Sequence, residues 1–237
     1  MIRSVRLLAS FVAIPLALVA GCAGGNPSAT ATPTAMDKLK ASGETMRQES
    51  AFHFDLQYDG QRGTPILAGM ELVSATGDFS SGDVQMTAGV RLTQLNAFVA
   101  QKVVAKGGET YLSDPITGRW SKAPPDQVPC ALSDMNARLA DLTLQAQTAS
   151  FSGEETLTGR ATQKIKATFP AQSFAPVVCG KAESGAVQTE VWLDKQSGHI
   201  LKVRLEGRIN PDEPEGLVRT LTFSQFGQAV DIQAPSL

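Results

Sequence analysis

The sequence predicts an α+β protein in which helices pack on the concave face of a curved antiparallel β-sheet. Many segments alternate apolar and polar residues, a pattern typical of strands that are solvated on one face only. Two other segments repeat apolar residues at helical spacing, so these helices can cover the apolar face of the sheet. The chain has 237 residues, 42% hydrophobic and 19% charged, which is sufficient for one domain with a hydrophobic core.

Strands are expected where the alternation has a period of two residues. The clearest segments cover residues 52–58, 84–92, 164–169, 187–193, 201–206 and 217–223. Weaker alternation predicts further strands at 68–74, 95–105 and 109–112. About ten strands in one sheet are therefore expected.

Two helices are expected, one before the strands and one between two groups of them. The first covers residues 36–47, where Met36, Leu39, Gly43 and Met46 follow one another every three or four positions. The second, of about four turns, covers residues 129–145 after a proline-rich loop. No repeat or break in composition divides the rest, so residues 36–237 are expected to form a single domain.

The N-terminus has the pattern of an export signal. Two arginines precede an apolar stretch, Leu7 to Ala20, that is shorter than the about 20 residues of a membrane-spanning helix. The stretch leads into Leu-Val-Ala-Gly-Cys at residues 18–22, which resembles the lipobox of bacterial lipoproteins. We expect residues 1–21 to be a lipoprotein signal peptide and Cys22 to be the lipidated residue. The alternative is an ordinary secretory signal that contains a cysteine by coincidence.

Residues 22–35 are expected to form the acylated cysteine and a flexible stalk, because they are small and polar. Two or three acyl chains on Cys22 hold a protein stably on a bilayer, whereas one chain binds only marginally. The expected location is therefore the cell membrane, with the protein lipid-anchored on its extracytoplasmic face.

Composition excludes several functions. Lys and Arg number 21 against 23 Asp and Glu, so the chain lacks the basic surface of a nucleic-acid-binding protein. Two histidines and three cysteines, far apart, leave little material for a metal site. Nucleophile, phosphate-binding and dinucleotide motifs are absent. We expect neither a cofactor nor a metal, and the sequence gives no support for an enzyme.

Three groups of polar residues are candidates for a functional site, but for each of them we expect a structural role. His53 and Asp55 share the polar face of a strand and are expected to be solvated. The segment 194–199 has the residue types of a hairpin turn. Asp212, Glu213 and Glu215 could bind a cation, but a solvated loop is expected.

Cys130 and Cys179 remain once Cys22 is acylated. In an oxidising, extracytoplasmic compartment a disulfide between them is expected, which would stabilise the fold by about 4 kcal/mol if it is unstrained. The alternative is two buried free thiols.

Three stretches support a family resemblance. They are Gly108–Leu112 followed by Thr117–Trp120, the segment Trp192–Asp194 leading into Gly198–Lys202, and the tail Thr222–Pro235. In this order, with the lipobox, the stalk and the helical insert, they resemble the mycobacterial lipoproteins grouped as LppX, LprA, LprF and LprG. The Cys130 and Cys179 pair departs from that pattern.

The resemblance implies a half-barrel sheet that encloses a hydrophobic cavity under helices, broadly like the LolA and LolB carriers. It also implies binding of lipids or lipoglycans with long acyl chains and their transport through the cell envelope. A lipid transporter in the membrane is a further expected partner. The expected lining combines residues of one strand with residues of the second helix: Met86, Ala88, Val90, Met135, Leu139 and Leu142.

The same residues are compatible with other functions. A filled core would suit a structural or interaction lipoprotein without a lipid ligand. An envelope hydrolase would need a nucleophile, and none is identifiable in the sequence.

Overall fold

A computed structural model describes residues 32–124, 132–174 and 183–237. The predicted signal peptide, Cys22 and the predicted disulfide partners Cys130 and Cys179 lie outside the described residues. Residues 33–237 belong to one compact unit.

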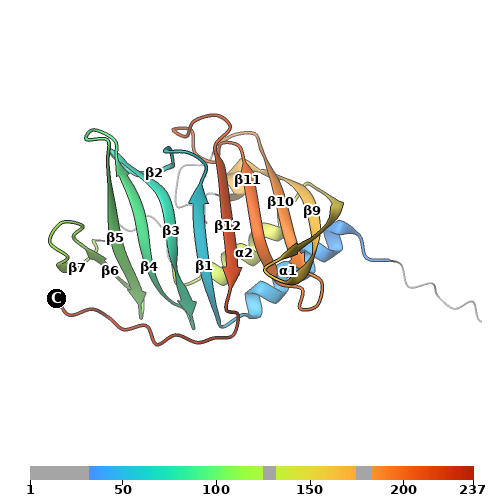
Figure 1. Cartoon of the computed structure of the whole chain (residues 1–237), viewed down its shortest axis with the longest axis horizontal. Helices are drawn as coiled ribbons and strands as arrows, with labels where there is room; N and C mark the ends of the chain where they lie inside the picture. Colours follow the sequence, from blue (N-terminus) through green and yellow to red (C-terminus); the bar gives the residue numbers. More distant parts are fainter. Residues whose placement is uncertain (1–31, 125–131, 175–182) are drawn as a thin grey trace, which may run out of the picture. The chain divides into compact units, whose positions relative to one another are not determined.

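The described chain builds one sheet of twelve strands, and every pairing in it is antiparallel (Figure 1). The strands are β1 (Ala51–Tyr58), β2 (Thr64–Leu67), β3 (Met70–Ser80), β4 (Asp83–Leu92), β5 (Ala97–Lys106), β6 (Glu109–Ser113), β7 (Trp120–Lys122), β8 (Thr148–Leu157), β9 (Arg160–Pro170), β10 (Ala186–Asp194), β11 (Ile200–Glu206) and β12 (Val218–Ser224). Their order is β7-β6-β5-β4-β3-β1-β12-β11-β10-β9-β8, and β2 pairs with β3 beside this path. Because β7 and β8 are opposite edges, the sheet is an open, curved half-barrel rather than a closed barrel.

The predicted strands are confirmed, and three strands of the structure were not predicted. The missed strands are β2, β7 and β8. β2 and β7 have only four and three residues, too few to show a period. β8 is an edge strand whose residues are nearly all exposed, so it lacks the alternation that one buried face imposes.

The first predicted helix is confirmed as α1 (Ala35–Gln48). It begins with a capping box, in which Thr34 Oγ1 accepts from the Asp37 backbone N–H and the Asp37 carboxylate accepts from the Thr34 backbone N–H. The second helix, α2 (Met135–Leu144), is shorter than predicted, because residues 132–134 form a turn and the helix begins after Asp134. Asp134 takes the N-cap position without a side-chain hydrogen bond to the helix, and Leu132, the first residue of the predicted apolar stripe, lies in the turn before it.

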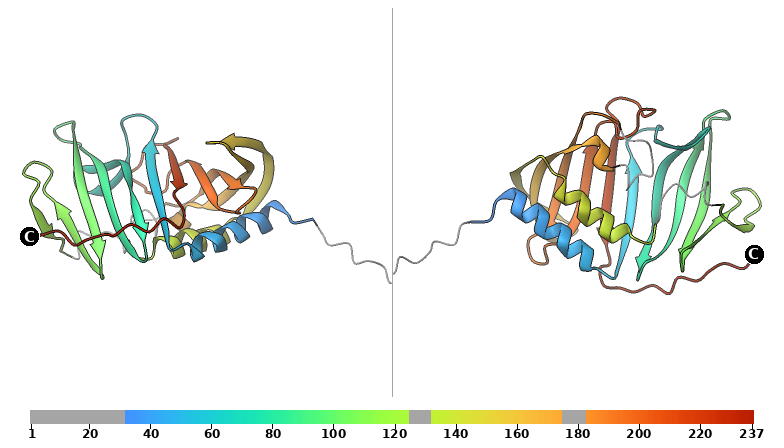
Figure 2. Two further views of the ribbon diagram at one scale, coloured as in Figure 1. Left: turned by 60° about the horizontal axis from the view of Figure 1, so that its bottom comes forward. Right: turned by 180° about the vertical axis from the view of Figure 1, so that it is seen from behind.

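The two helices pack against each other and cover the concave face over β8 to β12 (Figure 2). Gly43 of α1 allows the close approach, since a Cβ at this position would lie 2.0 Å from Oγ1 of Thr143 in α2. Asn136 of α2 donates through Nδ2 to the Arg47 carbonyl, 2.9 Å away, at the end of α1. The paired helices therefore act as one cover for this half of the sheet.

The predicted hairpin turn at 194–199 is confirmed, and a buried carboxylate organises it. Asp194 accepts hydrogen bonds from the backbone N–H groups of Gln196 (2.7 Å) and Ser197 (3.1 Å) and forms an ion pair with Arg160. Burial acts to raise the pKa of Asp194, but the two backbone donors and Arg160 outweigh it, so this pKa lies below its usual value of 3.8.

Asp194→Asn should therefore weaken the acid dependence of stability. A lowered pKa in the folded state means that Asp194 stabilises the fold above about pH 4, and that this contribution disappears as the pH falls through the folded-state pKa. We expect the variant to lose about 1–2 kcal/mol of unfolding free energy at pH 7 and less at pH 3. Urea unfolding at both pH values measures this, with the exposed Asp59→Asn as control. An equal loss at pH 7 and pH 3 would contradict the assignment.

Candidate functional site

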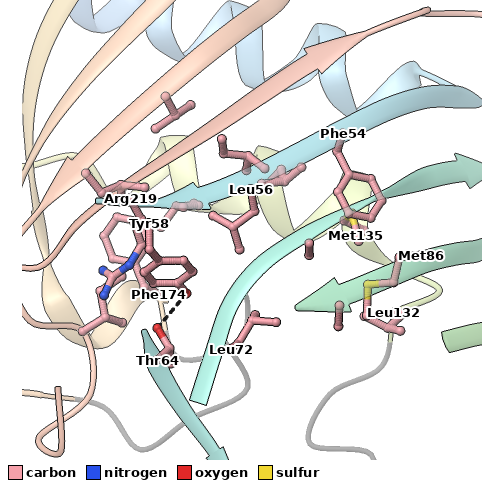
Figure 3. A pocket seen from close by; sticks show the side chains of 18 of the residues that line it. Phe54, Leu56, Tyr58, Thr64, Leu72, Met86, Leu132, Met135, Phe174 and Arg219 are labelled. Carbon is pink, nitrogen blue, oxygen red and sulfur yellow. Dashed lines mark hydrogen bonds between the residues drawn. The ribbon is translucent and has the colours of Figure 1, made fainter. Parts of the chain in front are cut away.

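A cavity of about 420 Å³ lies between the concave face of the sheet and the two helices (Figure 3). This volume is within the range of about 300–1,000 Å³ that small-molecule sites occupy. Its wall is almost entirely apolar, and side chains from both halves of the sheet, α1, α2 and the 3₁₀ helix η2 (Ala171–Phe174) contribute to it. A solid core therefore does not describe the inside of this half-barrel.

The structure places five of the six residues expected at the cavity in its wall. Met86 and Ala88 contribute from β4, and Met135, Leu139 and Leu142 contribute from α2. Val90 does not line it.

Val90 is 0% exposed and is not among the residues that line the cavity. Its partner across β3 is Leu72, next to a β-bulge that shifts the register before Ser74. Leu72 lines the cavity at this level. Val90 keeps the alternation of β4, which pairs with β5 in unbroken register, so alternation identifies the face of the sheet but does not say whether a side chain meets open space or packed neighbours.

Much of the lining was not anticipated from the sequence. Phe54, Leu56 and Tyr58 of β1 lie on the predicted apolar face, but alternation does not separate cavity residues from core residues. Leu39 and Met46 lie on the predicted apolar face of α1 and also line the cavity, and helical spacing does not separate cavity residues from core residues either. Phe174 in η2 also lines the cavity, and no periodic signal marks so short a helix.

The exposure of the lining residues differs between the two halves of the sheet. Wall residues of β9 and β10, such as Phe169 and Val191, are buried, and so is Leu205 of β11. In contrast, Leu67 is 39% exposed and Leu112 is half-buried, and both lie in the half that α1 and α2 leave uncovered. Leu67 and Leu112 are therefore places on β2 and β6 where solvent reaches the wall.

A buried polar cluster closes one end of the cavity. Glu213, between β11 and β12, accepts from the backbone N–H of Ile209 (2.7 Å) and from Thr64 Oγ1 (2.6 Å). Its Oε2 lies 2.7 Å from Nη2 of Arg219, and the side chains of this ion pair are 0% and 2% exposed. Figure 3 shows Arg219 beside Tyr58, with the guanidinium carbon 5.6 Å from the ring centre.

The expectation of a solvated acidic loop is wrong for Glu213. Asp212 and Glu215 are exposed as expected. Glu213, in contrast, is buried, with an exposed fraction of 4% for the whole residue. A buried carboxylate needs a partner charge and donors. Here they come from Arg219 on β12 and from Thr64 on β2, which the fold brings to the loop.

Tyr58 completes the cluster as a donor. Because Thr64 gives its hydroxyl proton to the carboxylate, the Tyr58 hydroxyl donates to Thr64 Oγ1 over 2.8 Å. Burial raises the pKa of Tyr58, so the phenol stays protonated and uncharged at neutral pH.

Other polar groups have structural partners away from the cavity. On the face of the sheet opposite the cavity, His53 Nδ1 of β1 lies 2.7 Å from Asp78 Oδ1 of β3. His199 Nε2 lies 2.6 Å from Glu49 Oε1. In residues 32–124, 132–174 and 183–237, no group of three His, Cys, Asp or Glu side chains could hold a metal ion. Among those residues, no helix is long and apolar enough to cross a membrane.

The buried ion pair predicts a large effect of one substitution. Glu213→Gln would leave the Arg219 charge buried without its counter-charge, and we expect it to cost about 3–5 kcal/mol of unfolding free energy. Glu215→Gln, in the same loop but exposed, should change stability by less than about 0.5 kcal/mol. The double variant Glu213→Gln, Arg219→Met should recover much of the loss. Equal urea midpoints for the two single variants would contradict a buried ion pair.

Comparison with known proteins agrees with this architecture. The structure of LprF from Mycobacterium bovis aligns with a TM-score of 0.67 and 15% identity, over 86% of this chain and 97% of that chain. LppX from Mycobacterium tuberculosis aligns with a TM-score of 0.59 and 18% identity, over 84% and 97%. These likenesses confirm the predicted half-barrel fold.

More distant comparisons add little. A LolA superfamily protein from Nitrosomonas europaea aligns over 85% of this chain and 96% of that chain, with 11% identity and a TM-score of 0.28, too low to support an argument. None of the curated proteins compared matches the chain. The family model described as LppX_LprAFG lipoprotein, however, matches residues 32–232, nearly all of the chain beyond the predicted stalk. The chain therefore belongs to the LppX_LprAFG lipoprotein family.

Proposed function

We propose that this protein is a membrane-anchored, extracytoplasmic lipoprotein that binds acylated lipids or lipoglycans and carries them through the cell envelope. The observation that carries the proposal is the apolar cavity of about 420 Å³ beneath α1 and α2. Long acyl chains suit such a wall, because each methylene group removed from water contributes about 0.8 kcal/mol. Membership of a lipoprotein family supports the anchored part of the proposal.

Carriage of this kind needs no catalysis. An acyl chain leaves one apolar medium, the bilayer, and enters another, so the transfer is nearly balanced in free energy and works in both directions. The proposal accordingly assigns no cofactor and no catalytic residue. Net direction would come from supply and removal of lipid, for example by a lipid transporter in the membrane.

The anchor raises the rate at which the cavity meets its donor membrane. In this proposal residues 1–21 are removed, Cys22 is acylated, and the stalk up to residue 35 keeps the domain near the extracytoplasmic leaflet. Tethering increases the effective concentration of the cavity at that surface without any new contact. The disulfide between Cys130 and Cys179 stays a prediction.

A substitution that fills the cavity tests the proposal. Ala88 lies in the wall on β4 and is 5% exposed, so Ala88→Trp directs an indole ring into the lipid volume. If the indole ring displaces only two methylene groups of an acyl chain from the cavity, the binding free energy falls by about 1.6 kcal/mol, or roughly tenfold in affinity. We expect at least that loss of bound long-chain lipid, measured by extraction and mass spectrometry of the purified protein.

Thr87→Trp is the matched control, because the next residue of β4 is directed to the opposite face of the sheet. It should retain the wild-type amount of lipid. Equal lipid content in the two variants, with both melting cooperatively, would contradict binding in this cavity. It would favour a structural or interaction lipoprotein instead.

A further inference from the structure

The cavity wall changes character along the strands. Residues paired across β1, β12, β11 and β10 form rows that cross the sheet, about 7 Å apart along each strand. One such row is wholly apolar and consists of Leu56, Leu221, Val203 and Val191. The next row, at the end near Glu213, consists of Tyr58, Arg219, Leu205 and Thr189. Polar wall residues on these strands are thus confined to one end.

Two side chains of this polar row have unused hydrogen-bonding atoms. Thr189 and Arg219 are 4% and 2% exposed, and both line the cavity. Thr189 Oγ1 and Arg219 Nε have no hydrogen-bond partner within the described part of the chain. A buried polar atom without a partner costs about 1–3 kcal/mol, so an acceptor on a bound molecule would remove a penalty that the empty protein bears.

The charge at this end limits what that acceptor can be. Arg219 is already neutralised by Glu213, whose oxygens are held by Thr64 and by backbone N–H groups. An anionic group placed here would add a buried charge with no counter-ion, which is costly. An uncharged acceptor such as an ester carbonyl avoids this cost and can still accept from a hydroxyl or a guanidinium.

We propose that the row Tyr58–Arg219–Leu205–Thr189 is a subsite that binds an ester carbonyl of an acyl lipid, with Thr189 and Arg219 as donors. The inference rests on the proposed lipid-binding function and names the ligand class: acyl esters rather than alkyl ethers or anionic amphiphiles. Thr189 and Arg219 lie on strands separated only by β11, so their backbones are about 10 Å apart. The acyl chain then runs from this row along the apolar rows.

Thr189 can present its hydroxyl without losing a contact. Rotation about χ1 moves the hydroxyl group of a threonine from one staggered position to another. Because Oγ1 has no partner in the described structure, the rotation breaks no hydrogen bond there. The same fact makes Thr189→Val a clean substitution, since it removes only an unpaired polar atom.

Three matched probes test the subsite: methyl palmitate, methyl hexadecyl ether and hexadecyl sulfate. Each is presented at trace level in vesicles of dialkyl-ether phosphatidylcholine, which contain no acyl ester. The chain from Ala23, which keeps every described helix and strand, is incubated with the vesicles and separated from them. Mass spectrometry then gives the uptake of each probe. The variants are Thr189→Val, Thr189→Ser and the control Thr220→Val, whose threonine is on β12 but does not line the cavity.

We expect wild-type protein to take up the ester about tenfold more than the ether, and to take up little sulfate. Thr189→Val should reduce the ester-to-ether ratio at least threefold without lowering the melting temperature, whereas Thr189→Ser and Thr220→Val should preserve the ratio. A wild-type ratio near one, an unchanged ratio in Thr189→Val, or a preference for the sulfate would overturn the subsite while leaving lipid binding intact. No uptake of any probe would overturn the proposed function as well.

Discussion

The structure depends on one mismatch of size, between a wide apolar sheet and two short helices. Eleven strands side by side span about 48 Å, whereas α1, with 14 residues, is about 21 Å long, and α2, with 10, is about 15 Å long. The helices therefore cover only part of the concave face. What they leave is the apolar cavity and, on β2 and β6, partly exposed lining residues such as Leu67 and Leu112. A filled core would need more side-chain volume than these two helices supply, so the space is a consequence of the architecture.

Because of the buried ion pair, the two ends of the cavity differ in polarity. Glu213 and Arg219 fix the loop between β11 and β12 to the sheet, and Thr64 connects the same carboxylate to β2. One end of the cavity is thereby polar, while the neighbouring row of wall residues on β1, β12, β11 and β10 is apolar. The cluster is a structural connection first, and in the proposed ester subsite it offers Arg219 Nε, which has no hydrogen-bond partner among the described residues, as a donor to the ligand.

Much of the fold could be predicted from the sequence. Most strands have one solvent-exposed face and one buried face, and this imposes an alternation of polar and apolar residues. Nearly all residues of β8 are exposed, so it lacks this alternation and is not predicted from the sequence. The second helix was predicted one turn too long, since apolar spacing continues through a turn that Ser133 and Asp134 favour. Lining residues are harder to predict: Val90 fits the alternation but is packed and does not line the cavity, and Glu213 is buried only because the fold brings Arg219 and Thr64 to it. Both depend on contacts between strands, which a linear pattern does not contain.

The most direct test of the account is whether the cavity holds lipid when the protein is made where such lipids exist. Residues 23–237, which lack Cys22 and hence the anchor's own acyl chains, would be expressed in a lipid-rich actinobacterial host and compared by native and denaturing mass spectrometry. We predict an excess mass in the native spectrum that disappears on denaturation and corresponds to a lipid with long acyl chains. A native mass equal to that of the bare chain, in a protein that melts cooperatively, would contradict the carrier function.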